Sequence, residues 1–265
     1  MPILIRNPHS VLAVLDARPE DVLQITIPRS LARSPSGSGQ QVQRDAWEQV
    51  VRIARKHKIQ IVEAASGGLN QQRRAATMGP FDGGREGAAE ASVRERQGVS
   101  VEELFSGAKE RAEGRGLWLA LDSLQDPRNV GAIFRVAAFF GVEGILLTQE
   151  RSAPLSAAVY DVASGGMEYV PFTIQTNLQR AFEVAKESGL WVLGTSEHAH
   201  DDFRSIERDR SWLLVLGNEE KGVRRLTAES CDVLCKVSPQ GREPKVTSLN
   251  VSVAAGIMIA HLSNR

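Results

Sequence analysis

The chain has 265 residues, of which 42% are hydrophobic, 24% charged and 5% aromatic, a composition typical of a globular protein with one or two domains. Its 32 basic and 32 acidic residues give no net charge, which excludes a strongly basic nucleic-acid-binding tail but not a local basic surface. Residues 1–115 contain 17 basic and 14 acidic residues and the remainder 15 and 18, so a slight positive excess falls in the N-terminal part.

The N-terminal part predicts a small α/β module. Its apolar run at Val11–Leu15 is too short for a signal peptide or a membrane span, so we expect a cytoplasmic protein with no membrane association. A helix is predicted over Ala46–His57, where apolar side chains recur at near-helical spacing, and a strand over Ile59–Val62.

Two stretches of the first half predict loops. Arg33–Gln41 is rich in serine, glycine and proline, and Ser66–Gly98 contains glycine pairs followed mostly by alanine, glutamate and arginine. Such compositions bury little apolar surface. We therefore expect a small domain at 1–65, a flexible linker at 66–115 and a second domain at 116–265.

From Leu117 onward, short apolar runs alternate with helical stretches, which predicts an α/β fold with a parallel sheet and helices on both faces. The predicted strands are Leu117–Leu121, Gly144–Thr148, Trp191–Thr195, Trp212–Gly217 and Val233–Val237. The predicted helices are Asn129–Phe140, Leu155–Ala163, Leu178–Ser188, Arg224–Ser230 and Ser248–Leu262. Arg135 lies off the apolar stripe of the first helix, near its start, where it can face a ligand.

Candidate metal ligands are few. Cys231 and Cys235 lie in an apolar run that predicts a strand, and because no second ligand pair accompanies them we expect buried free thiols rather than zinc ligands. His198 and His200 precede two aspartates, and this cluster favours a solvated loop over a metal site. We therefore expect no metal.

Parallel sheets bind ligands at the carboxyl ends of their strands, and three loops at these ends are polar. They are Asp122–Arg135, Leu216–Gly222 and Val246–Val253. No dinucleotide-binding glycine pattern occurs, and the glycines of the second loop lack the lysine and hydroxyl residue of a phosphate-binding loop. Each loop alone is explained by a helix cap or a tight turn, whereas all three together favour one composite site.

The three loops also carry a family resemblance. DPRNVGAIFR at 126–135, LVLGNEEKG at 214–222 and SLNVSVAAGI at 248–257 resemble motifs one, two and three of the SpoU-type (TrmH-like) RNA 2′-O-ribose methyltransferases of the SPOUT superfamily. Two intervening stretches resemble the subgroup that methylates a guanosine ribose of 23S ribosomal RNA: Arg151–Leu155 and Ala163–Pro171. Asn7–Leu15 and Val22–Ile27 resemble that subgroup's small RNA-binding domain, which is similar to the ribosomal L30e fold.

The resemblance implies a C-terminal deep trefoil knot that binds S-adenosyl-L-methionine, a homodimer, and a substrate that is structured RNA, above all ribosomal RNA. It implies that the cofactor lies against the backbone around Thr195, Leu216, Gly217, Val237 and Leu249. It implies that the polar active-site residues are Asn129, Arg135, Glu219, Ser248 and Asn250.

The identity of the general base stays open. Family mechanisms assign the proton of the ribose hydroxyl to the motif-one arginine, here Arg135. Because a guanidinium keeps its proton in proteins, an alternative is that Arg135 holds the adjacent phosphate while Glu219 or the phosphate accepts the proton. Ser248 and Asn250 have simple helix capping as their alternative role.

The chain departs from the subgroup in one region. The subgroup usually has a His-Gln-Gly element between its domains, whereas the corresponding stretch here is Gly87–Arg94, and Met78–Arg85 before it looks inserted. Transfer RNA is therefore the alternative substrate, and a non-catalytic RNA-binding ribosome-assembly factor is the alternative of a different class. The presence of Arg135, Glu219 and Asn250 favours an enzyme.

Overall fold

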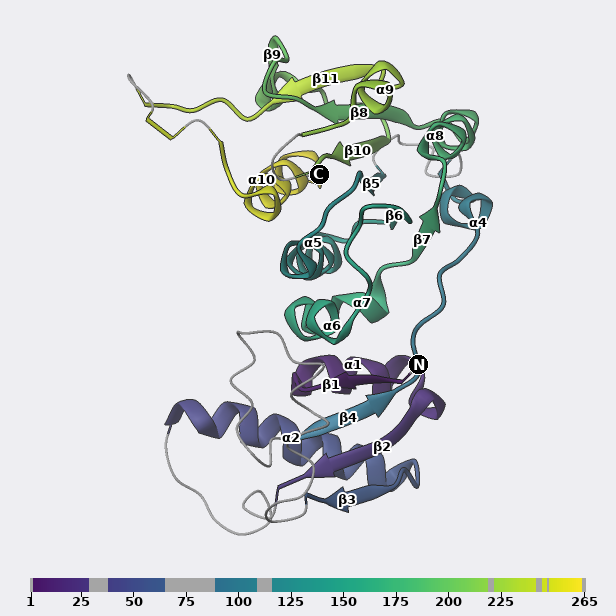
Figure 1. Cartoon of the computed structure of the whole chain (residues 1–265), viewed down its shortest axis with the longest axis vertical. Coiled ribbons are helices and arrows are strands. Elements are labelled where there is room, and N and C mark those ends of the chain that lie inside the picture. Colours follow the sequence, from purple (N-terminus) through teal and green to yellow (C-terminus); the bar gives the residue numbers. More distant parts are fainter. Residues whose placement is uncertain are drawn as a thin grey trace. The chain divides into compact units, whose positions relative to one another are not determined.

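The computed structural model describes residues 2–28, 38–64, 89–108, 116–218, 222–241, 245–246 and 248–263, and of residues 38–41 it describes the backbone alone. The chain divides into two compact units, Met1–Glu95 and Arg96–Arg265, each with its own sheet (Figure 1). Within the described part of the chain, no helix is long and apolar enough to cross a membrane.

The first unit combines a small sheet with two helices. Its sheet has the order β1-β4-β2-β3, in which β4 runs antiparallel to β1 and β2, and β3 runs parallel to β2. The elements are β1 (Ile3–Ile5), α1 (Pro8–Ala17), β2 (Val22–Ile27), α2 (Ser38–Lys56), β3 (Ile61–Glu63) and β4 (Glu90–Val93). Helix α1 begins where Oδ1 of Asn7 accepts a 2.9 Å hydrogen bond from the His9 amide, with Pro8 in the first turn.

The range predicted as a flexible linker, 66–115, contains two elements of the folded units. Strand β4 belongs to the first unit, where Ala91 and Val93 are fully buried. Helix α4 (Val101–Phe105) belongs to the second unit, where Phe105 joins the core. The division between the units therefore falls at Glu95, and the other parts of the predicted linker, 66–88 and 109–115, lie outside the described residues.

The second unit is built on a parallel sheet with the order β7-β6-β5-β10-β8-β11-β9, which confirms the predicted parallel α/β architecture. Its strands are β5 (Leu117–Leu121), β6 (Gly144–Thr148), β7 (Phe172–Gln175), β8 (Trp191–Thr195), β9 (Asp201–Asp202), β10 (Trp212–Leu216) and β11 (Val233–Lys236). Its helices besides α4 are α5 (Pro127–Phe140), α6 (Ala157–Ala163), α7 (Gly166–Tyr169), α8 (Leu178–Glu187), α9 (Arg225–Glu229) and α10 (Val251–Ser263).

Helices cover both faces of this sheet, with α4 and α8 on one side and α5 and α10 on the other (Figure 1). Successive strand residues point to opposite faces, so Trp118 and Val215 pack in one core with Phe105 and Phe182. On the other side, α5 buries the predicted apolar stripe that includes Ile133. Both faces of the central strands are therefore apolar, and polar groups are confined to the strand ends.

The connection after β10 brings the end of the chain back to the middle of the sheet. Strand β10 lies between β5 and β8, whereas β11 lies on the far side of β8. The chain then returns, and α10 packs against α5 and β5. As a result, three segments far apart in the sequence meet near the centre of the sheet: the start of α5, the loop after β10 and the start of α10.

Candidate functional site

The carboxyl ends of β8 and β10 bring together three of the residues predicted to contact a cofactor. Thr195 ends β8, Leu216 ends β10 and Gly217 follows it. The Thr195 hydroxyl donates a 3.0 Å hydrogen bond to the carbonyl of Val215, which ties the two strand ends together. Leu216 and Gly217 are buried and Thr195 is half-buried, so this edge of the sheet offers mostly main-chain groups.

The other two predicted cofactor residues come from flanking elements. Val237 directly follows β11, the neighbour of β8, and is half-buried. Leu249 precedes α10 by two residues, and 49% of its surface is exposed. The five predicted positions are thus distributed over three adjacent strand ends and the entry to α10.

Asn129 and Asn250 are joined by a side-chain hydrogen bond. Nδ2 of Asn250 donates to Oδ1 of Asn129 over 3.0 Å. Asn129 lies in the first turn of α5, because the Asp126 cap and Pro127 start the helix directly before it. Its side chain is buried, with only 7% of the residue exposed. The first and third polar loops therefore meet, as one composite site requires.

Asn250 also caps α10. Its Oδ1 accepts hydrogen bonds from the amide and the hydroxyl of Ser252, at 2.9 and 2.6 Å, and its carbonyl accepts the first hydrogen bonds of the helix. The helix predicted from Ser248 accordingly begins at Val251. Capping and contact with Asn129 use different atoms of one amide, so Asn250 caps α10 and binds Asn129 at the same time.

Arg135 is exposed on α5. Its guanidinium forms no ion pair with any residue in the described part of the chain, so it is available for an anion. It lies eight residues after Pro127, more than two helical turns into α5, rather than near the helix start as the sequence suggested. At Gly166, a Cβ atom would come within 3.0 Å of the Arg135 Cα, so α7 approaches the backbone of α5 directly here.

Of the two remaining predicted catalytic residues, the structure describes Ser248 but not Glu219. Ser248 is exposed just before the cap of α10. Glu219 lies outside the described residues, although the flanking Asn218 and Gly222 are described and pair with each other in an antiparallel bridge.

The sequence interpretation assigned no role to Asp122, which the structure places at the centre of the polar edge. Asp122 directly follows β5, is fully buried, and forms a 2.7 Å ion pair with Nε of Arg224. A charged residue immediately after five buried apolar residues is the signal that could have identified it, because a buried carboxylate requires a partner.

The two cysteines are poorly suited to thiolate chemistry. Burial, with a smaller contribution from nearby carboxylates, raises the pKa of both Cys231 and Cys235 to about 12, so both thiols stay protonated at neutral pH. His198 and His200 are exposed. Among the described residues, no group of three or more histidine, cysteine, aspartate or glutamate side chains could hold a metal ion.

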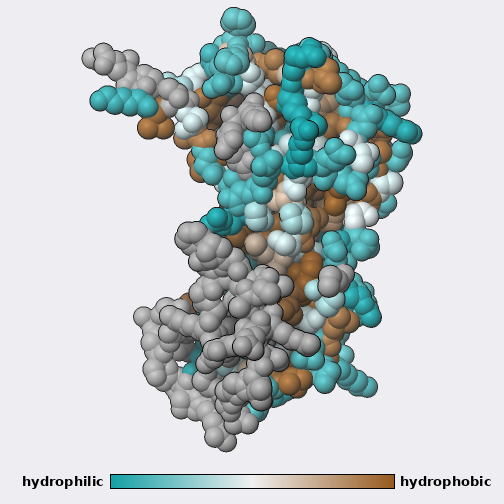
Figure 2. Space-filling view, viewed as in Figure 1, coloured by the Kyte–Doolittle hydropathy of each residue, from teal (hydrophilic) through white to brown (hydrophobic). Residues whose placement is uncertain are grey.

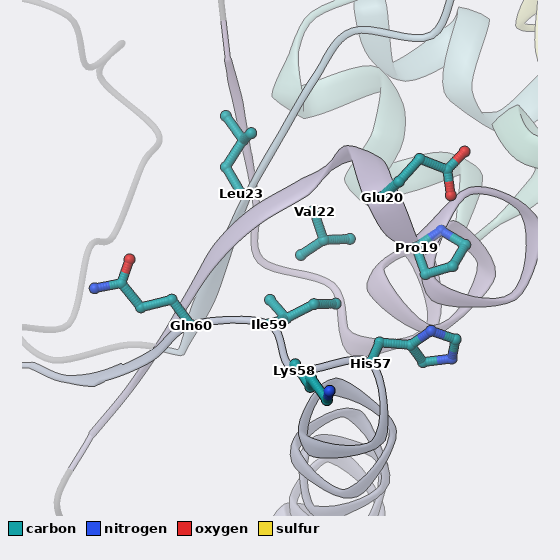
Figure 3. A pocket seen from close by; sticks show the side chains of 8 residues that line it. All are labelled: Pro19, Glu20, Val22, Leu23, His57, Lys58, Ile59 and Gln60. Carbon is teal, nitrogen blue, oxygen red and sulfur yellow. The ribbon is translucent and has the colours of Figure 1, made fainter.

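An open depression of about 600 Å³ lies in the first unit (Figure 3). It is lined by Pro19, Glu20, Val22, Leu23, His57, Lys58, Ile59 and Gln60. Lys58 has a left-handed φ of 58° where the chain leaves α2. The depression is part of the first unit's surface and not of the strand-end site.

The chain is similar to proteins of one known family. The model of the SpoU rRNA Methylase family matches residues 116–260. A Bacillus subtilis (strain 168) protein assigned to the TrmH family of tRNA/rRNA methyltransferases, YacO, is 36% identical over 80% of this chain and 80% of its own.

A second relative is the 23S rRNA (guanosine-2′-O-)-methyltransferase RlmB of Nitrosomonas europaea, which is 42% identical over 66% of this chain; the match spans 64% of the relative's length. Among solved structures, the AdoMet-bound rRNA methyltransferase of Sinorhizobium meliloti aligns with a TM-score of 0.70 at 19% identity, covering 98% of this chain and 86% of that one. At 19% identity, this structural similarity shows a shared fold and nothing further.

Proposed function

The chain belongs to the SpoU rRNA methylase family, and from that membership we propose that it transfers the methyl group of S-adenosyl-L-methionine to a ribose 2′-hydroxyl of structured RNA. The observation that carries the proposal is the Asn129–Asn250 hydrogen bond, because it joins the first and third family motifs at one edge of the sheet. The second motif begins at the end of β10, which lies beside β5 in the same sheet.

The experiment is transfer of labelled methyl from S-adenosyl-L-methionine to RNA, followed by nuclease digestion and separation of the nucleosides. Label on ribose oxygens is expected. Label on a base nitrogen or carbon would contradict the proposal, and binding of RNA without transfer would favour the assembly-factor alternative.

The residues at the strand ends fit S-adenosyl-L-methionine. Thr195, Leu216 and Gly217 present main-chain groups at the ends of two adjacent strands, suited to the hydrogen-bonding edge of an adenine. Leu249 and Val237 add apolar surface on which a ring can rest. When bound, the sulfonium supplies an electrophilic methyl group whose transfer requires no metal.

The polar residues of the site then have separate tasks. Arg135, exposed and without an ion-pair partner in the described chain, holds an RNA phosphate next to the target ribose. Asn129 and Asn250 hold the first turns of α5 and α10 together. Ser248 donates a hydrogen bond to the substrate. Orientation of this kind can supply roughly 7–11 kcal/mol of a barrier. Glu219 or the held phosphate accepts the hydroxyl proton.

We propose a guanosine of large-subunit ribosomal RNA as the target. The name of the Nitrosomonas europaea relative, 42% identical to this chain, supports that assignment. The name of the Bacillus subtilis relative covers both transfer RNA and ribosomal RNA. Ribose-methylation mapping of total RNA from a deletion strain, with an Arg135→Ala complemented strain as control, distinguishes the two substrates.

The topology supports a deep trefoil knot in the second unit. The insertion of β10 between β5 and β8, followed by the return of α10 to β5, is the arrangement that a threaded C-terminal segment requires. We likewise propose that the first unit is an L30e-like RNA-binding domain. Its small sheet with α1 and α2, together with the positive excess of residues 1–115, supports this role.

We propose a homodimer built on α5 and α10. The surface in the view of Figure 2 is largely hydrophilic with hydrophobic patches between, and large apolar side chains are exposed on these two helices. They are Phe139 on α5, at 81%, and Val253 and Ile257 on α10, at 51% and 38%. Because α5 and α10 pack against each other, a second copy could cover all three.

A further inference from the structure

Asp122 is a fully buried carboxylate at the end of the central strand β5. Its backbone amide donates a 2.8 Å hydrogen bond to the carbonyl of Leu216, which extends the pairing of β5 with β10. Its Oδ1 accepts from the Ser123 hydroxyl at 3.1 Å and from Nε of Arg224 at 2.7 Å, and Oδ2 accepts from the backbone amide of Arg224 at 3.4 Å. The carboxylate therefore binds Arg224 through both its side chain and its main chain.

Arg224 marks the end of the loop that follows β10. It is the N-cap residue of α9 and makes no side-chain cap of its own, so Asp122 supplies an acceptor to that helix start from another strand. The start of the loop is tied to the same place, because Nδ2 of Asn218 donates 2.9 Å to the carbonyl of Ser123. Both ends of this loop are thus held by Asp122–Ser123.

The two described ends of the loop lie against each other. Asn218 and Gly222 exchange backbone hydrogen bonds of 3.0 and 2.9 Å. A Cβ atom at Gly217 would lie 2.1 Å from backbone atoms of Gly222 and Val223, so the returning chain lies directly on Gly217. Gly217 is one of the proposed cofactor positions.

The anchor on β5 is held in a costly conformation. Ser123 has a φ of 63°, in the left-handed region that residues other than glycine rarely adopt, and it is buried. Its amide donates a 2.8 Å hydrogen bond to the hydroxyl of Thr148 at the end of β6. The left-handed turn aims its carbonyl at Asn218, so the strain and the loop attachment are parts of one arrangement.

We infer that Asp122 and Arg224 are positioning residues for methyl transfer: their ion pair helps to fix the two described ends of the loop after β10, Gly217–Asn218 and Gly222–Arg224, against the ends of β5 and β10. This inference rests on the proposed function. A buried carboxylate paired with a half-exposed arginine contributes little to stability because desolvation opposes the attraction. What the pair provides instead is a defined geometry.

A matched control exists in the same unit. Lys186 and Asp232 form a 2.6 Å ion pair in which Asp232 also accepts 2.8 Å from the Val192 amide near the start of β8. That pair likewise joins a helix to the sheet through a carboxylate and a backbone amide, but at the opposite end of the strands. The control reproduces the connection but not the burial, because the Asp232 carboxylate is partly exposed and that of Asp122 is buried.

The test compares Asp122→Asn, Arg224→Gln and Arg224→Lys with Asp232→Asn and Lys186→Gln in the full chain. Hydrogen–deuterium exchange, the dissociation constant of S-adenosyl-L-methionine, and kcat and KM on RNA are measured. For Asp122→Asn and Arg224→Gln we expect faster exchange confined to 217–224 and a kcat about 10- to 100-fold lower, because small misplacements of reacting groups are costly. Arg224→Lys should partly restore kcat.

The control variants should lower the melting temperature less, because Asp232 is partly exposed, and should leave kcat unchanged. Equal kcat in all variants, or exchange that rises throughout the second unit, would overturn the inference. Because the exchange readout needs no catalysis, a wild-type protein that transfers no methyl to a ribose refutes the proposed function separately from the loop attachment. If Asp122→Asn does not fold, the half-exposed Arg224 variants carry the test.

Discussion

The side-chain amide of Asn250 donates a 3.0 Å hydrogen bond to Oδ1 of Asn129, a residue 121 positions earlier in the chain. The bond joins the cap of α10 to the first turn of α5. Both partners are uncharged, so the pair defines a geometry without adding a charge beside the phosphates of a substrate. Its energetic and catalytic contributions can be separated by substitution.

Asn250→Asp retains the oxygen that caps α10 but cannot donate to Asn129. We expect it to lose about 1 kcal/mol of stability with the hydrogen bond to the buried Asn129, and to lose turnover about 10- to 100-fold through lost positioning. Asn250→Ala should lose the same turnover and also about 1 kcal/mol of stability with the cap. Single-turnover methylation and urea unfolding measure the two effects.

The control for this pair is Asn177→Ala on α8, where Oδ1 of Asn177 accepts a 3.2 Å hydrogen bond from the Arg180 amide. It should lose a similar amount of stability with no change in turnover. Wild-type turnover by Asn250→Asp would limit Asn250 to capping.

Arg135→Ala should lower kcat and kcat/KM together while leaving the affinity for S-adenosyl-L-methionine unchanged, because Arg135 is exposed on α5 and is proposed to face RNA. Arg180→Ala, another exposed arginine on the opposite face of the sheet, should change none of these constants. Calorimetry and methylation kinetics provide the comparison. Loss of cofactor affinity in Arg135→Ala would show that the assigned role is wrong.

Val253→Asp should produce a monomer, because it places a charge in the apolar face of α10 that a second copy is proposed to cover. Leu226→Asp is the matched control, since Leu226 on α9 is equally exposed, at 53%, and lies outside the proposed interface. Sedimentation velocity at micromolar concentration reports the state of each variant. A monomeric wild type would refute the dimer.

The raised pKa of Cys231 and Cys235 predicts a decline in stability at alkaline pH. An unfolded thiol loses its proton near pH 9, whereas the folded thiols keep theirs until about pH 12. The raised pKa values therefore make their full contribution to the stability of the folded state below pH 9. This contribution is lost as the pH rises toward 12. The unfolding free energy, measured with urea between pH 8 and 10, should fall less steeply with pH in the double variant Cys231→Ala/Cys235→Ala than in wild type. In the folded protein, the thiols should react slowly with a disulfide reagent at pH 8.

A fragment that begins at Arg96 should fold and bind S-adenosyl-L-methionine. A fragment that begins at Val101 should be less stable, because it lacks the Val99 amide that donates 2.8 Å to the carbonyl of Phe172. On RNA the Arg96 fragment should lose affinity, and the difference from the full chain should shrink as salt rises, since phosphate contacts weaken with ionic strength. Equal activity at low salt would exclude RNA binding by the first unit.

The regular part of the fold is readable in the sequence because the central strands are buried on both faces. Leu117–Leu121 and Gly144–Thr148 agree with β5 and β6 residue for residue, since an uninterrupted apolar run is what a covered parallel strand requires. Strand β7 was missed because Phe172–Gln175 is a short edge strand with an exposed isoleucine. Strand β4 was missed because its inward residues include alanine, which carries little hydrophobic signal.

The sequence identifies candidate residues of the site but not the connections between them. The polar strand-end loops identify Asn129 and Asn250 as candidates, yet only the fold shows that their amides meet. Asp122 was overlooked because its partner, Arg224, is 102 residues away, and no local pattern reports a pairing at that distance. Long-range ion pairs depend on strand order, here the placement of β10 beside β5.

The boundary between the two units lies between two arginines that are anchored in different units. Arg94 is fastened to the first unit by hydrogen bonds to Glu20 and Asp21, and Arg96 is fastened to the second by its hydrogen bonds to Met167 and Val170. A single residue, Glu95, lies between these anchors, so each unit is held by its own hydrogen bonds up to the boundary. Cleavage of the chain at Glu95 should therefore leave each unit with its terminal arginine still anchored.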